Sequence, residues 1–236
     1  MIPLTNIEAA AGRIAPYVLT TPTATSSTLS DELGTNVVLK LELLQKTGSF
    51  KPRGALHKVL SLSVEEQRAG IITVSAGNHA QAVAWAASVV GAPAVVVMPQ
   101  GAPQSKLEAV RGYGGEIVLH DDRATLFDRL HEEQEKRGST FVHPFDDPVL
   151  LAGTASVGLE ILEDLPEVEV VFVPVGTLVY PVLVAQLADL FLRVHGVDWV
   201  IAAGLYEDSL LIWVRAHRPD AHAGELVQGV VGDRGS

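Results

Sequence analysis

IITVSAGNHAQAVAWAASVVGAPAVVVM, residues 71–98, is the stretch of sequence that decides the fold. Its two ends, 71–74 and 94–98, are continuous apolar runs rich in Val and Ile, which is typical of strands buried on both faces of a parallel sheet. The middle, HAQAVAWAASVV, has the apolar spacing of a helix and stops at Gly-Ala-Pro. Strand, helix and strand in this order form a βαβ unit, which predicts an α/β fold with right-handed crossovers.

The same alternation runs along the rest of the chain. Further strands are predicted at 36–42, 115–119, 168–175 and 198–203. Helices are predicted at about 50–60, 78–90, 104–112, 122–136, 147–163 and 178–195. The segment 122–138 has apolar residues on one face and charges on the other, which indicates a surface helix.

Composition excludes several classes of protein. The 236 residues are 47% hydrophobic and 19% charged, which is far from a disordered chain. The absence of cysteine excludes a disulfide framework, a thiolate metal site and a cysteine nucleophile. With 28 acidic against 17 basic residues, nothing resembles the basic patch that a nucleic-acid partner requires.

We expect no membrane partner and a cytoplasmic location. The apolar stretch 177–195 is interrupted by Pro181, Asp189 and Arg193, so it predicts a buried core helix rather than a membrane span. The first residues, MIPLTNIEAAAGRIAPYV, lack the basic and apolar regions of a signal peptide.

Ligands of open α/β sheets bind where strands lead into helices, so the turns at 46–55, 75–82 and 174–177 are the candidate sites. Lys51 stands at the start of a predicted helix, where the helix dipole and partial burial lower the pKa of an amine. A neutral lysine amine can form a Schiff base with a carbonyl compound. The alternative is an ordinary exposed lysine in a helix-initiating turn.

The turn Ser75-Ala76-Gly77-Asn78 also has two interpretations. Its small residues let a carboxylate or phosphate approach the free N–H groups of the first helical turn. Alternatively it is an ordinary capped helix, with Ser75 or Asn78 as the N-cap. His79 is expected to pack in the first helical turn rather than to act as a general base.

Four segments together carry a family resemblance: LELLQKTGSFKPRGA (41–55), TVSAGNHAQAVAWAA (73–87), AVVVMPQGAPQSKLEAVRGYGGEIV (94–118) and FVHPFDDPVLLAG (141–153). In this order they resemble the fold-type II pyridoxal-phosphate enzymes, in the threonine dehydratase and serine racemase branch. The resemblance covers about residues 1–176. The combination of S-F-K-x-R-G-A with S-x-G-N-H-A-Q is its specific part.

The resemblance implies roles for individual residues. Lys51 corresponds to the catalytic lysine that holds pyridoxal 5'-phosphate and moves the substrate's α-proton, and Phe50 corresponds to the residue beside the cofactor ring. Asn78 corresponds to the side chain that hydrogen-bonds the cofactor's phenolic oxygen. The loop that grips the substrate carboxylate corresponds to Ser75, Ala76, Gly77, Asn78 and His79.

The implied reaction is β-elimination of L-threonine or L-serine, which gives a 2-oxo acid and ammonia. Similar racemases carry a proton-donating serine at the position of Ala76, so the sequence is closer to the dehydratases. Gly176 and Thr177 supply part of the phosphate cradle, although Leu178-Val179-Tyr180 replaces the family's glycine run. The family's divalent-metal ligands cannot be placed in residues 198–236, so no metal site is expected.

The implied architecture is two open twisted αβα domains, as in the tryptophan synthase β-like fold. Residues 54–148 form the smaller substrate domain, and 1–53 with 149–236 form the larger cofactor domain, with Lys51 at the cleft between them. The chain ends before the family's ring-nitrogen serine, so the large domain is expected to be incomplete. The alternative function is a non-catalytic or truncated relative that keeps the fold for binding or assembly. Members of the family are commonly homo-oligomers.

Overall fold

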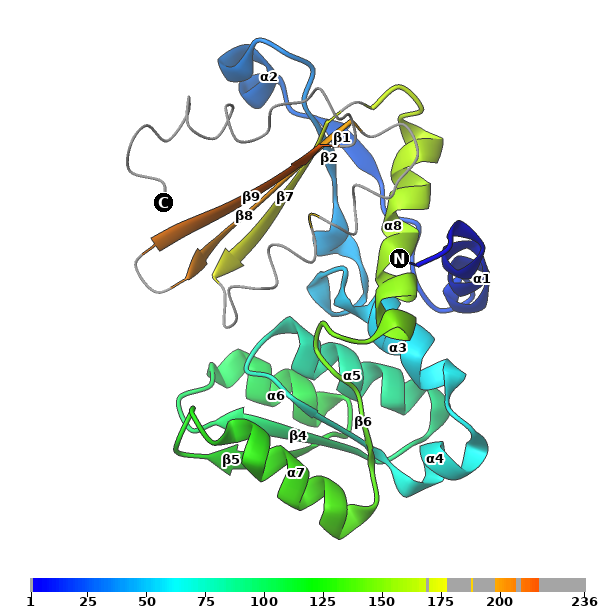
Figure 1. Cartoon of the computed structure of the whole chain (residues 1–236), viewed down its shortest axis with the longest axis vertical. Helices are drawn as coiled ribbons and strands as arrows, with labels where there is room; N and C mark the ends of the chain where they lie inside the picture. The colour runs from blue at the N-terminus through cyan, green and yellow to red at the C-terminus, as the bar shows by residue number, and fades with distance from the viewer. Residues whose placement is uncertain (1, 169, 178–187, 189–197, 207–208, 217–236) are drawn as a thin grey trace. The chain divides into compact units, whose positions relative to one another are not determined.

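The computed structural model describes residues 2–168, 170–177, 188, 198–206 and 209–216. The chain divides into two compact units, Met1–Val157 and Gly158–Ser236, and each is described by itself. Figure 1 shows the elements of both units.

A four-stranded parallel sheet organises the first unit. Its strands are β3 (Ile71–Val74), β4 (Ala94–Pro99), β5 (Glu116–His120) and β6 (Thr140–Phe141). Their order is β5-β4-β3-β6, and every pair is parallel. All residues of β3 and β4 are buried, as their continuous apolar runs predict.

Helices cover both faces of this sheet (Figure 1). They are α3 (Lys51–Ser61), α4 (Val64–Ala69), α5 (Asn78–Val90), α6 (Gln104–Gly112) and α7 (Leu126–Arg137). Because side chains alternate along a strand, Val96 and Met98 pack against α5 and α6, while Val95 and Val97 pack against α7. The result is the three-layer αβα arrangement that the sequence predicts.

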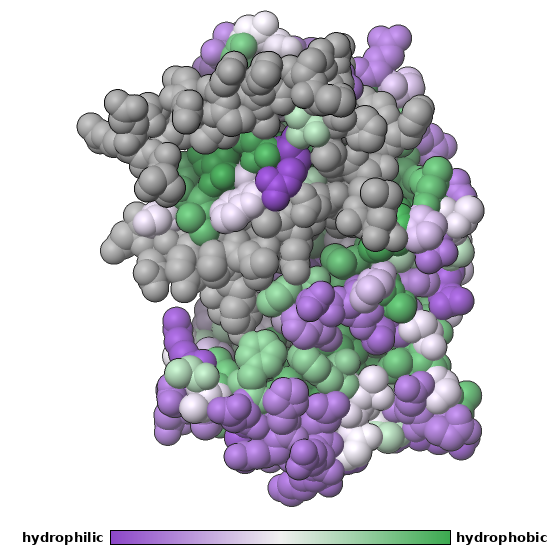
Figure 2. All heavy atoms as spheres, viewed as in Figure 1, coloured by the Kyte–Doolittle hydropathy of each residue, from purple (hydrophilic) through white to green (hydrophobic). Residues whose placement is uncertain are grey.

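α7 is the surface helix that the charge pattern predicts. It buries Leu126, Leu130 and Glu133, and Figure 2 shows hydrophilic residues over its outer side. Glu133 is buried because Arg129 and Arg137 pair with its two carboxylate oxygens at 2.7 and 2.8 Å. The helix therefore follows the ordinary rule that a buried charge is paired.

The N-terminal part of the first unit precedes α3. It comprises α1 (Leu4–Ile14), β1 (Thr23–Thr25), α2 (Ser27–Leu33), β2 (Val38–Lys40) and the 3₁₀ turns η1 (Glu42–Leu44) and η2 (Lys46–Gly48). β1 and β2 form an antiparallel pair. The prediction of a strand at 36–42 was too long, because the strand spans only Val38–Lys40 and η1 begins at Glu42.

α8 (Pro148–Asp164) begins in the first unit and ends in the second. The second unit contains β7 (Val170–Thr177), β8 (Trp199–Tyr206) and β9 (Ser209–Ala216) in the order β7-β8-β9. β7 and β8 are parallel, whereas β9 returns antiparallel to β8. The sequence predicts β7 and β8 but not β9.

Most predicted helices begin or end within a few residues of their predicted positions, and α5 and α6 match them at both ends. The sequence interpretation missed α1, α2 and α4. Apart from Ala188, the predicted helix at 178–195, including Leu178-Val179-Tyr180, lies outside the described residues. No helix in the described part of the chain is long and apolar enough to span a membrane. The predicted domain division, 54–148 against 1–53 with 149–236, stays a prediction.

Candidate active site

Lys51 is the first residue of α3, three residues after the end of the 3₁₀ turn η2 at Gly48. Its Nζ donates a hydrogen bond to the carbonyl oxygen of Pro144 at 3.1 Å and lies 5.3 Å from the centre of the Phe50 ring. Burial lowers the pKa of the Lys51 amine from 10.5 to about 8. Far more of this amine is neutral near pH 8 than for a solvated lysine. The alternative of an ordinary exposed lysine is therefore wrong.

A buried ion pair holds the turn that carries Lys51. Arg53 is 1% exposed, and its Nε and Nη2 donate to the two carboxylate oxygens of Glu42 at 2.9 and 2.8 Å. Gln45 adds two hydrogen bonds to the backbone of Leu19, one through its side-chain oxygen and one through its nitrogen. The arginine of the S-F-K-x-R-G-A motif thus orients the lysine turn.

Two glycines let α3 and α8 pack closely. A Cβ on Gly54 would lie 2.6 Å from the carbonyl oxygen of Leu150, and a Cβ on Gly153 would lie 2.6 Å from that of Arg53. Real Cβ atoms do not approach backbone this closely, so larger residues would push the helices apart. The glycine after Arg53 in the motif therefore serves helix packing.

The β3–α5 turn presents a helix N-terminus without a side-chain cap. The N-cap is Gly77, and neither Ser75 nor Asn78 caps α5. Instead, Ser75 Oγ accepts a hydrogen bond from the Gly77 N–H at 3.1 Å. A Cβ on Gly77 would meet only Ser75 Oγ, at 4.0 Å, so the space beside this glycine is open. The free N–H groups of an uncapped helix start suit a carboxylate or phosphate.

His79 turns its side chain into the protein. It is 4% exposed, and its Nε2 lies 3.2 Å from the carbonyl oxygen of Val142. Burial, and then the positive charge of Lys51, lower the pKa of His79 to about 3. The ring is therefore neutral at ordinary pH, and it packs in the first turn of α5 as the sequence predicts.

Two buried hydroxyl groups without partners lie in the turn that precedes Lys51. Thr47 Oγ1 and Ser49 Oγ are buried and form no hydrogen bond, and Nδ1 of His79 is in the same condition. Thr47 also adopts a left-handed backbone conformation with φ of 61°. Unsatisfied buried groups and a strained non-glycine residue are both features that collect at functional sites.

Asn78 begins α5 and is tied to its surroundings through its side-chain oxygen. Lys106 Nζ donates to Asn78 Oδ1 at 2.7 Å, and Gln81 Nε2 lies 3.3 Å from the same oxygen. Gln81 Nε2 also donates to the carbonyl oxygen of Thr47 at 2.7 Å. The start of α5 and the lysine turn are thus joined directly.

The structure brings together Lys51, Phe50 and the Ser75–His79 turn, all within the first unit. Gly176 and Thr177 end β7 in the second unit, opposite Gly204 and Leu205 of β8. Their assignment to a phosphate cradle stays a prediction.

Sequence reasoning missed the carbonyl groups of Val142 and Pro144 and the hydrogen bond of Lys106 to Asn78. One signal could have found them. The carboxyl ends of parallel strands meet at one edge of a sheet, so the segments after β4 and β6 had to lie near the segment after β3.

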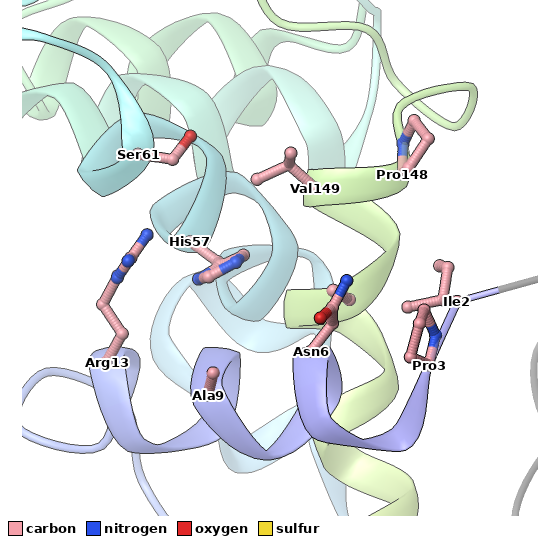
Figure 3. Close-up of a pocket in the computed structure, with 10 residues that line it drawn as sticks. Ile2, Pro3, Asn6, Ala9, Arg13, His57, Ser61, Pro148 and Val149 are labelled. Carbon is pink, nitrogen blue, oxygen red and sulfur yellow. The ribbon is translucent and has the colours of Figure 1, made fainter.

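The first unit also contains a cavity of about 370 Å³ between α1, α3 and the start of α8 (Figure 3). Its polar lining includes Asn6, Arg13, His57 and Ser61. None of the predicted site residues lines it, so it is separate from the lysine site.

Residues 14–180 match the family model described as pyridoxal-phosphate dependent enzyme. The chain is 49% identical over 180 residues to L-threonine ammonia-lyase of Thermotoga maritima, covering 75% of this chain and 44% of that protein. It is 45% identical over 179 residues to the catabolic L-threonine dehydratase TdcB of Staphylococcus aureus, covering 75% and 51%. The chain thus spans about half the length of these relatives.

Solved structures agree with the sequence comparison. Maize serine racemase superposes with a TM-score of 0.77 at 35% identity, covering 85% of this chain and 60% of that one. The threonine deaminase from T.th. gives a TM-score of 0.74 at 40% identity, with coverage of 86% and 64%. The likeness in fold therefore extends beyond the segments that carry the motifs.

Proposed function

Because the chain belongs to the family of pyridoxal-phosphate dependent enzymes, we propose that it supplies the lysine half of an active site for β-elimination of L-threonine or L-serine. The products are a 2-oxo acid and ammonia. When bound, pyridoxal phosphate supplies the electron sink for the carbanion that forms at the substrate's α-carbon. The relatives named L-threonine ammonia-lyase and L-threonine dehydratase support this choice of substrate.

The observation that carries the proposal is the buried amine of Lys51. Its pKa of about 8 leaves part of the amine neutral near physiological pH, and the neutral amine is the form that would hold the cofactor. The same amine, close to its pKa, can take a proton from the substrate's α-carbon and return it. The carbonyl oxygen of Pro144 accepts a hydrogen bond from Nζ and so orients the amine.

The described residues fit the cofactor and the substrate. The buried hydroxyls of Thr47 and Ser49 lack partners, and hydroxyl groups suit a ligand rich in hydrogen-bonding oxygens. The uncapped start of α5, from Ser75 to His79, offers backbone N–H groups to the substrate carboxylate.

Further assignments follow the family resemblance. Phe50 lies beside the cofactor ring, and the amide of Asn78 donates to the phenolic oxygen. Gly176 and Thr177 contribute to the phosphate cradle. Elimination rather than racemisation is proposed because Ala76 has no proton to give to the face opposite Lys51.

The wider organisation is also part of the proposal. Residues 54–148 form the substrate domain, and 1–53 with 149–236 belong to the cofactor domain. The protein acts in the cytoplasm on a small amino acid, as a homo-oligomer.

The test is reconstitution with pyridoxal phosphate. The wild-type chain, Lys51→Ala and Lys136→Ala are each titrated, and the visible absorbance of lysine-bound cofactor is recorded. Lys136 is the matched control, because its side chain is 73% exposed on α7. We expect the band in the wild type and in Lys136→Ala only. We also expect conversion of L-threonine to 2-oxobutyrate to fall at least about a hundredfold in Lys51→Ala.

Equal absorbance bands in the wild type and Lys51→Ala would show that Lys51 is not the attachment site. A band at Lys51 without any 2-oxobutyrate above a heat-killed control would favour the non-catalytic relative. The two readouts therefore separate cofactor binding from turnover.

A further inference from the structure

The amide of Asn78 has only one orientation that suits its neighbours. Lys106 lies in α6, and its Nζ is 2.7 Å from Asn78 Oδ1. An ammonium group can donate hydrogen bonds but cannot accept them, so the atom of Asn78 that faces Lys106 must be the oxygen. The NH₂ group of the same amide then points the other way and keeps its donors for another partner.

Gln81 supports the same orientation. Its Nε2 is 3.3 Å from Asn78 Oδ1, and this nitrogen also donates to the carbonyl oxygen of Thr47 at 2.7 Å. Because the Gln81 NH₂ group can only donate, the atom of Asn78 that faces it must also be the side-chain oxygen. Lys106 contributes the shorter and charge-assisted bond, and such bonds are about twice as strong as neutral ones.

We propose that Lys106 is a positioning residue of the cofactor site, which holds the amide of Asn78 so that its NH₂ group serves as the donor to the cofactor's phenolic oxygen. The inference rests on the proposed function, in which Asn78 makes that contact. A phenolate oxygen accepts hydrogen bonds, so it is stabilised by an NH₂ group and repelled by a carbonyl oxygen. The two atoms of an amide exchange places by a simple flip of the side chain.

Lys106 fixes one of the two amide orientations of Asn78, although the Asn78 side chain is exposed. Asn78 lies on the surface of the first turn of α5, where water can satisfy either orientation. Without Lys106, the remaining protein donor to Asn78 Oδ1 among the described residues is Gln81, at the longer distance. The positive charge of Lys106 also polarises the amide, which makes its N–H groups better donors.

Lys106→Met removes the donor and keeps much of the side chain's length. Because hydrogen bonds to charged groups are the stronger class, we expect the apparent affinity for pyridoxal phosphate to fall about tenfold. Lys106→Arg keeps a cationic donor and should restore most of the affinity. Lys136→Met, on the exposed surface of α7, is the matched control and should bind as the wild type does.

If the hydrogen bond from Lys106 only held α6 against α5, then Lys106→Met would lower the stability of the protein and not its affinity for the cofactor. Thermal unfolding of the cofactor-free variants is therefore measured beside the titrations, and we expect Lys106→Met to stay within about 2 °C of the wild type. A double-mutant cycle with Asn78→Ala decides whether Lys106 acts through Asn78. In the Asn78→Ala background, Lys106→Met should cause no further loss of affinity.

The outcomes separate this inference from the proposed function. If the wild type shows no band of lysine-bound cofactor, the proposed function fails and this inference fails with it. If the wild type binds and Lys106→Met binds equally well, only this inference is overturned. An equal loss in the wild-type and Asn78→Ala backgrounds also overturns it, because Lys106 would then act elsewhere. Lys106→Leu also removes the donor and replaces Lys106→Met in the cycle if that variant does not fold.

Discussion

His79→Gln tests the electrostatics of the buried site, because His79 is neutral in the folded protein and easily protonated in the unfolded chain. Burial and the charge of Lys51 lower the pKa of His79 from 6.5 to about 3. The unfolded chain therefore binds a proton as the pH falls through about 6.5, whereas the folded protein does not. Stability contributed by the neutral ring is thus present at neutral pH and is lost progressively toward pH 3.

The magnitude follows from the size of the pKa shift. Below pH 6.5, each unit of pH lowers the free energy of unfolding by about 1.4 kcal/mol, because only the unfolded chain takes up the proton. The interval down to pH 5 covers roughly 1.5 such units, so the free energy of unfolding should fall by about 2 kcal/mol between pH 7 and pH 5 through this residue alone. Lys51, with a pKa of about 8, stays charged throughout this interval. His57 and His143 also have lowered pKa values, but they are present in both proteins and cancel in the comparison.

The assay is urea unfolding of the wild type, His79→Gln and His131→Gln at both pH values. Glutamine can still donate to the carbonyl oxygen of Val142, but it does not titrate. We expect the loss of stability between pH 7 and pH 5 to be about 2 kcal/mol smaller in His79→Gln than in the wild type. The exposed His131→Gln should retain the wild-type dependence. Equal losses in His79→Gln and the wild type would refute the reasoning.

Two further predictions concern the packing that supports Lys51. Gly54→Ala would place a Cβ 2.6 Å from the carbonyl oxygen of Leu150, so it should destabilise the protein by about 1–3 kcal/mol in thermal unfolding. Gly12→Ala in α1 has open space around it and should instead stabilise by about 0.5–1 kcal/mol; a destabilisation similar to that of Gly54→Ala would contradict the steric argument. Glu42→Gln leaves the buried charge of Arg53 without its carboxylate and should cost about 3–5 kcal/mol in urea unfolding. The exposed Glu132→Gln is its control, and an equal small effect in both variants would show that the buried pair does not support the turn.

The sequence predicts the parallel sheet well because buried strands carry their own signal. β3 and β4 are continuous Val- and Ile-rich runs, and the helix between them ends at a glycine. α4 was missed although Ser63 and Glu66 form a capping box, because its six residues are too short to show periodicity. β9 was missed because its antiparallel partner β8 had been assigned to a continuing series of βαβ units.

The site was predictable to the extent that its chemistry depends on residue types in local motifs. Lys51 and the turn from Ser75 to His79 each lie within one motif. The contacts of Lys51 with Pro144, and of Asn78 with Lys106, join residues that are 93 and 28 positions apart in the chain. Such contacts arise from the tertiary packing of strands and helices, so no local sequence pattern predicts them. The cap of α5 was also ambiguous from sequence, since serine and asparagine are both good N-caps and neither is used.

The charge of Lys51 acts on His79 but not the reverse, so near pH 8 His79 is neutral while the Lys51 amine is only partly neutral. The charge of Lys51 contributes to lowering the pKa of His79, whereas burial is the cause of the lowered pKa of Lys51. When Lys51 titrates near pH 8, His79 has already lost its proton and exerts no charge. When His79 titrates near pH 3, Lys51 carries a full positive charge. Burial is therefore what lowers the pKa of Lys51, and the neutral histidine adds no second positive charge beside it.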